Sequence, residues 1–226
     1  MVLLQRSPNN HGKNRGQPVD HVLYFRDSSF KKMKLSQALQ YETPGSWTQA
    51  VMSDFDAFLQ DHADCERKAS AMAMSFVYKC PDKVKIIPML IDTAVEELDH
   101  FKQVYEIMEK RGVQLRHHTE RDPYVDPLLK LLRTPSPQRL LDRFLLASII
   151  ECRGTERFRM VADAVDEPEL KQFYKMLWVS EAKHGNIFVE MALEYYDRQE
   201  VYKRLDELVV SEAGICATLP HRAALH

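Results

Sequence analysis

Two tetrapeptides of the form Glu-x-x-His, Glu97–His100 and Glu181–His184, constrain this chain more than any other feature. On a helix, side chains three residues apart lie on the same face. Each tetrapeptide is preceded by a Glu inside an apolar helical stripe: Glu66 lies 31 residues before the first and Glu151 lies 30 residues before the second. The pattern therefore occurs twice, as a helix with one Glu, a turn, and a helix with Glu-x-x-His.

Four helices carrying these side chains are typical of di-iron and di-manganese carboxylate bundles. The six candidate metal ligands are Glu66, Glu97, His100, Glu151, Glu181 and His184. We expect the first Glu of each half to bind one ion, the Glu of each tetrapeptide to bridge both ions, and each His to complete one coordination shell. Carboxylates and imidazoles in this ratio favour iron or manganese over zinc. The alternative, a pair of buried Glu–His hydrogen bonds without metal, would leave four carboxylates in an apolar core without a cation.

Apolar periodicity predicts an all-α fold, which we interpret as a ferritin-like four-helix bundle with one long crossover connection and a short C-terminal helix. The expected helices run from Ser46 to about Cys80, from Asp82 to Gly112, from Ser136 onward, from Glu167-Pro168 onward, and from about Glu200 to Glu212. Residues 113–137 contain four Pro and one short amphipathic piece, Leu128–Leu132. A largely non-helical segment of this length can return along the whole bundle.

Residues 33–226 are expected to form a single domain, whereas residues 1–32 show no apolar periodicity. Residues 1–34 contain seven Lys or Arg and two Asp, although the net charge of the whole chain is only -2. We interpret residues 1–32 as a disordered basic extension, or as an over-long gene start upstream of Met33. Four widely spaced Cys and the absence of an apolar leader favour a cytoplasmic protein. No apolar run is long enough to cross a membrane.

The residues around the candidate ligands resemble the tRNA 2-methylthio-N6-isopentenyladenosine hydroxylase family of ferritin-like non-haem di-iron monooxygenases. The resemblance covers about residues 40–215 and is carried by His62–Ala69, Glu97–Phe101, Glu151–Phe158 and Ser180–His184. It implies a tRNA-modifying enzyme that hydroxylates the isopentenyl side chain of a modified adenosine next to the anticodon. It also implies two iron ions, O2 as co-substrate, and electrons from a reductase or ferredoxin.

Three further residues lie close to the candidate ligands. Thr155, one turn after Glu151, is a candidate for assisting O2 activation, because the arrangement resembles bacterial multicomponent monooxygenases. The alternative for Thr155 is a hydroxyl that bonds its own helix. His62, one turn before Glu66, is expected to support a ligand or the core rather than to bind metal, and Glu96 is expected on the solvated face of its helix.

RNA contacts are expected from basic side chains, and the prenyl group is expected in an apolar lining. The basic candidates are Arg67, Lys68, Arg153, Arg157 and Arg159, each of which could instead form an ordinary salt-bridged helix face. The candidates for the lining are Phe101, Phe158, Phe188 and Trp178. An alternative function with the same ligands is that of a rubrerythrin-like or ferritin-like peroxidase or iron-handling protein, and a non-catalytic scaffold is a third. The electron donor, the oligomeric state and the need for the methylthio group stay open.

Overall fold

The structure, a computed structural model, describes residues 38–117, 121–134 and 136–226, so the predicted basic extension lies outside the described residues. The described part is helical and contains no strand, which confirms the predicted all-α fold. Its helices are α1 (Gly45–Ser53), α2 (Phe55–Lys79), α3 (Ile87–Arg111), α4 (Val125–Leu129), α5 (Ser136–Ala164), α6 (Pro168–Leu193) and α7 (Arg198–Cys216). None of these helices is long and apolar enough to cross a membrane.

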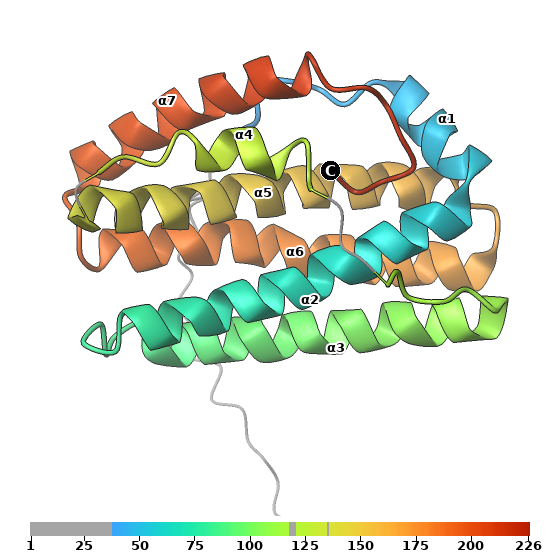
Figure 1. Cartoon of the computed structure of the whole chain (residues 1–226), viewed down its shortest axis with the longest axis horizontal. Coiled ribbons are helices and arrows are strands. Elements are labelled where there is room, and N and C mark those ends of the chain that lie inside the picture. Colours follow the sequence, from blue (N-terminus) through green and yellow to red (C-terminus); the bar gives the residue numbers. More distant parts are fainter. Residues whose placement is uncertain (1–37, 118–120, 135) are drawn as a thin grey trace, which may run out of the picture. The chain divides into compact units, whose positions relative to one another are not determined.

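Helices α2, α3, α5 and α6 form the four-helix bundle, with α2 packed on α3 and α5 packed on α6 (Figure 1). The core consists of two apolar clusters, a first one around Phe58 and Phe158 and a second one around Phe76 and Phe188. Along α2 and α6 the chain passes the first cluster before the second, and along α3 and α5 it passes them in the reverse order. Helices α3 and α5 therefore run in the same direction. The segment between them, which contains α4, has to return along the bundle, as the crossover prediction requires.

The first two predicted helices differ from the structure at one position each, and local backbone chemistry explains both differences. The first predicted helix is divided at Asp54, whose backbone is not helical (φ -146°, ψ 69°) and whose side chain accepts a hydrogen bond from Ala57 N at 3.1 Å. Asp54 thereby caps α2. The second predicted helix begins at Ile87 instead of directly after Asp82, because the intervening residues form turns. Its predicted end at Gly112 is confirmed, since Gly112 adopts the left-handed conformation (φ 70°) that ends many helices.

Helix α7 is longer than predicted and is anchored to the bundle by buried charges. Asp197 caps α7 by accepting from two backbone N–H groups of its first turn. Arg153 Nε on α5 lies 2.8 Å from Glu212 Oε1 on α7, and both side chains are fully buried. The hydroxyl of Tyr124 on the crossover segment donates to the same Glu212 oxygen at 3.0 Å. Because a buried charge is tolerated only when it is paired, these contacts fix α7 and the crossover segment to α5.

Candidate metal centre

The structure brings all six candidate ligands together between the two apolar clusters. Helices α2 and α5 each supply one Glu, and α3 and α6 each supply one Glu-x-x-His, all of them buried. Two groups of four can be formed whose ligand atoms lie within 4.8 Å of one another: Glu66, Glu97, His100 and Glu181, and Glu97, Glu151, Glu181 and His184. Glu97 and Glu181 belong to both groups, which is the placement that bridging carboxylates need.

Both imidazoles direct Nδ1 towards the carboxylates. His100 Nδ1 lies 2.7 Å from Glu181 Oε1, and His184 Nδ1 lies 2.7 Å from Glu97 Oε1 and 2.8 Å from Glu181 Oε2. In spite of these short distances, both Glu97 oxygens, Glu181 Oε1 and His100 Nδ1 lack a hydrogen bond of acceptable geometry within the described residues. Buried polar atoms without a partner are costly. A cation between these atoms would satisfy them.

The protonation of the cluster also indicates that positive charge is needed. Burial, followed by the charges of Glu97 and Glu181, raises the pKa values of Glu66 and Glu151 well above the usual range. Burial alone would lower the pKa of the two imidazoles, but their carboxylate neighbours raise the pKa of His100 to about 9 and that of His184 to about 12. Two divalent ions would replace these protons and balance four carboxylates. The donor set therefore fits a pair of iron or manganese ions.

His62 supports a candidate ligand from within the apolar core. His62 Nε2 lies 2.6 Å from Glu66 Oε1, and His62 Nδ1 lies 3.3 Å from the hydroxyl of Tyr174. Burial lowers the pKa of His62 to about 3, so its ring is neutral, and it shares one hydrogen bond with Glu66 and one with Tyr174. His62 lies outside both groups of four, in agreement with the supporting role predicted for it.

Glu96 contacts a candidate ligand, although we expected it on the solvated face. Glu96 Oε2 lies 2.9 Å from His184 Nε2, and its side chain is half exposed. A carboxylate that accepts the proton of one ring nitrogen orients the imidazole and leaves the other nitrogen for a metal. The sequence carried one signal for this role, a second Glu directly before the Glu97–His100 motif. It did not indicate that this Glu would contact His184 on α6.

An apolar cavity of about 290 Å³ reaches Glu151. Its apolar wall comes from α2, α4 and α5: Ala69, Met72, Val125, Leu129, Leu146, Ala147 and Ile150. Lys68 also lines the cavity and is exposed, which marks the side that opens to solvent. None of the four side chains predicted for the lining contributes to this cavity. The cavity lies against the crossover segment, and helical periodicity does not report where that segment packs.

Thr155 does not line this cavity. Its hydroxyl donates to Glu151 O at 2.8 Å, as the alternative expectation for this residue describes. Thr155 also lines a second pocket of about 460 Å³ with Arg159 and Trp178. Its role in O2 activation stays a prediction.

The five basic candidates for RNA contact occupy unlike environments. Arg67, Lys68 and Arg159 are exposed, with Arg67 ion-paired to a neighbouring Asp and Arg159 lying 5.4 Å from the ring centre of Trp178. Arg153 and Arg157 are buried. Arg153 pairs with Glu212 of α7, and Arg157 donates to the backbone carbonyl of Leu225. These internal partners leave only the first three available at the surface.

Comparison with known proteins identifies relatives of the chain. Residues 31–226 match the family described as tRNA-(MS[2]IO[6]A)-hydroxylase (MiaE). The tRNA 2-(methylsulfanyl)-N(6)-isopentenyladenosine(37) hydroxylase of Pseudomonas putida is 36% identical over 184 residues, which is 81% of this chain and 89% of that protein. The hydroxylase of the same name from Salmonella typhimurium is 35% identical over 108 residues, 48% of this chain and 39% of that protein.

A solved structure supports the ferritin-like fold. It is described as protein 43 with aldehyde deformylating oxygenase activity from Synechococcus. The TM-score is 0.78 at 31% sequence identity, and the match covers 84% of this chain and 96% of that chain. The bundle and its order of helices are therefore shared with an oxygenase.

Proposed function

Because this chain belongs to the MiaE family of tRNA hydroxylases, we propose that it hydroxylates the isopentenyl side chain of 2-methylthio-N6-isopentenyladenosine next to the anticodon of tRNA. The observation that carries the proposal is the pair of overlapping four-ligand groups beside an apolar cavity. When bound there, two iron ions would supply the oxidising chemistry, the activation of O2 for insertion of one oxygen atom into a C–H bond. The electrons would come from a reductase or ferredoxin.

The apolar cavity is suited to the isopentenyl group. A short branched alkyl chain gains free energy when it leaves water for an apolar wall. Glu151 at the inner end of the cavity would place the reacting carbon beside the metal ligands. At about 290 Å³ the cavity lies near the lower limit of small-ligand pockets, which is about 300 Å³. It therefore suits the alkyl chain, with the nucleoside base held at the mouth, and the dry wall would limit side reactions with water.

Two basic residues at this cavity support an RNA substrate. Lys68, one of the predicted RNA contacts, is exposed and lines the cavity, and Arg143 on α5 lines it as well. Lys and Arg bind phosphates, which supply much of the affinity of nucleic-acid complexes. The modified base has to leave its stack to reach the cavity, which is easier in a single-stranded loop than in a duplex. A tRNA substrate also agrees with the cytoplasmic location expected from the sequence.

The same ligands would serve a peroxidase or an iron-handling protein, so the substrate has to be tested directly. The reduced, iron-loaded protein should add one oxygen atom to a prenylated anticodon stem-loop in the presence of O2, as measured by mass spectrometry. RNA without the prenyl group should not react. Rapid reduction of peroxide without any mass gain in the prenylated RNA would favour the peroxidase.

A variant pair tests the cavity. Ala69 and Ala71 lie on the same helix, but only Ala69 lines the cavity, whereas Ala71 is exposed. Ala69→Phe should fill the cavity and lower product formation at least about tenfold, with unchanged iron content. Ala71→Phe should retain the activity. Equal activity of the two variants would show that the prenyl group binds elsewhere.

A further inference from the structure

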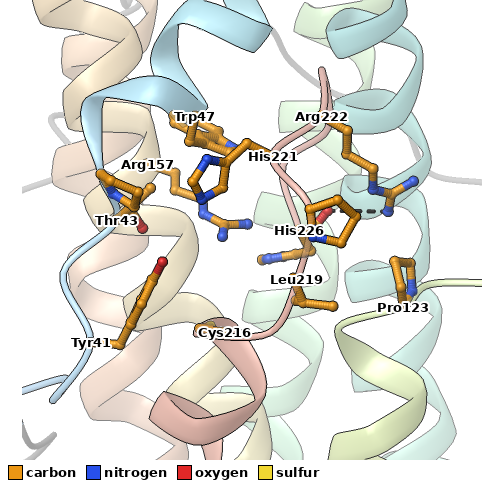
Figure 2. Close-up of a pocket in the computed structure, with 12 residues that line it drawn as sticks. Tyr41, Thr43, Trp47, Pro123, Arg157, Cys216, Leu219, His221, Arg222 and His226 are labelled. Atoms are coloured by element: carbon orange, nitrogen blue, oxygen red, sulfur yellow. Dashed lines mark hydrogen bonds between the residues drawn. The ribbon is translucent and has the colours of Figure 1, made fainter.

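The tail segment (residues 217–226) folds back from α7 onto α1, α2 and α5 (Figures 1 and 2). Trp47 Nε1 on α1 donates to a carbonyl of the segment at 3.0 Å, and Arg157 on α5 donates to Leu225 O. The backbone N–H of Leu225 donates to a carboxylate of α2 at 2.8 Å. These bonds hold the next residue, His226, in the wall of the apolar cavity that reaches the candidate metal ligands.

The imidazole of His226 is stacked on an aromatic ring but has no hydrogen-bond partner among the described residues. It stacks on Tyr124 of the crossover segment, with ring centroids 4.9 Å apart and an interplanar angle of 17°. His226 is only 9% exposed, and its Nδ1 is fully buried without a hydrogen-bond partner. Within the described residues, neither ring nitrogen is bonded to another protein group. Because Nδ1 is inaccessible to solvent, a ligand in the cavity could contact only the other ring nitrogen, Nε2.

The ring of His226 is neutral at physiological pH. Burial lowers its pKa to about 3, and the nearby cations Arg157, Arg153 and Lys68 act in the same direction against the single carboxylate of Asp122. A neutral imidazole carries one N–H donor and one acceptor nitrogen. His226 can therefore accept a hydrogen bond from a ligand in the cavity.

The other polar groups of the cavity are less suited to accept such a bond. Lys68 and Arg143 are donors only. Glu151 is a candidate metal ligand. Asp122 already accepts backbone N–H groups at 2.9 and 3.2 Å at the start of α4. Both bonds of Asp122 go to Oδ1, so within the described protein the acceptors left in the wall are His226 and Asp122 Oδ2, and His226 is the neutral one of the two.

We propose that His226 accepts a hydrogen bond from the exocyclic N6–H of the prenylated adenine. This inference rests on the proposed function. N6 is the atom that joins the alkyl chain to the base, so an alkyl chain in the cavity places N6 at its wall. Tyr124 holds the imidazole plane, and the tail segment positions it. An analogue without the N–H would leave His226 Nε2 without a partner, and sites of this kind reject such analogues strongly.

Binding under anaerobic conditions tests this contact separately from turnover. The probes are two anticodon stem-loops that differ in one atom: one carries N6-prenylated adenosine, and the other carries an ether oxygen in place of N6–H. The wild-type, iron-loaded protein should bind the ether about 10- to 100-fold more weakly. His226→Phe keeps a flat ring against Tyr124 but removes both nitrogens, so it should bind both RNAs weakly and equally. Equal binding of the two RNAs by the wild type would overturn the proposal, and this result does not depend on whether His226→Phe folds.

The control is His221→Phe, the same substitution at an exposed position of the tail segment. His221→Phe should retain the preference for N6–H over oxygen, and both variants should retain iron. A full preference in His226→Phe would also overturn the proposal. Mass gain in prenylated RNA without this preference would support the hydroxylase while refuting the role of His226. A preference that depends on His226, without any mass gain, would support recognition while refuting the hydroxylase.

Discussion

Helices α5 and α6 approach closely at Gly185, directly after the candidate ligand His184. A Cβ at residue 185 would lie 2.7 Å from Cys152 Sγ and 3.5 Å from Ser148 O. Ser148 Oγ also donates to Gly185 O at 2.6 Å, which ties the two backbones together. Gly185→Ala should therefore displace the side chain of Cys152 or push the two helices apart.

The size of the effect follows from two opposing terms. Overpacking of this kind costs about 1–3 kcal/mol. Replacing Gly by Ala within a helix gains about 1 kcal/mol. Gly214→Ala on α7 is the matched control, because a Cβ there would meet no atom within 4 Å and only the gain applies. The two variants should differ by about 1–3 kcal/mol in the free energy of unfolding, or roughly 2–12 °C in Tm for a chain of this size.

Urea unfolding and thermal melting of both variants measure this difference, and iron analysis tests its consequence for the site. Separation of α6 from α5 moves Glu181 and His184 away from Glu151, so Gly185→Ala should also hold less iron. Cys152→Ala removes the clashing sulfur and should restore part of the stability in the double variant. If Gly185→Ala stabilised the protein as much as Gly214→Ala, the argument from close helix packing would be refuted.

Three further predictions concern single side chains. Glu97→Ala and Glu181→Ala should each lose most of both irons, as measured by metal analysis. The control Glu106→Ala, on the exposed face of α3, should keep both irons. Two tightly held irons in Glu97→Ala would contradict a bridging role for Glu97. Thr155→Val should retain iron and Tm but lower the ratio of hydroxylated product to O2 consumed. An unchanged ratio would show that the hydroxyl of Thr155 only bonds the backbone of its own helix. His226→Phe should reduce the acid sensitivity of folding. The folded-state pKa of about 3 lies below the unfolded value of 6.5, so the unfolded chain takes up the extra proton and stability is lost as pH falls below 6.5. From pH 7 to pH 5 the contribution of His226 to this loss is about 2 kcal/mol, so the loss measured between the two pH values should be smaller by about that amount in His226→Phe than in the wild type.

Much of the bundle and of the ligand set could be predicted from the sequence. Helical periodicity reports which residues of one helix share a face, so Glu66 and Glu151 could be recognised as carboxylates inside apolar stripes. Glu-x-x-His spacing places both of its side chains on one face. The length of the segment after Gly112 indicated a crossover, because consecutive antiparallel helices need only short turns. The break at Asp54 escaped this reasoning, since the apolar stripe continues through a capping residue.

By itself, the sequence determined which side chains each helix directs inward, and with them the six candidate ligands that meet in the bundle. Only the tertiary structure decided which groups on different helices touch. Glu96 reaches His184, and Arg153 is buried against Glu212, because of the rotation and offset of whole helices. The cavity beside Glu151 and the placement of His226 in its wall likewise depend on how irregular segments pack. Such contacts join residues far apart in the chain, and periodicity within one helix carries no information about them.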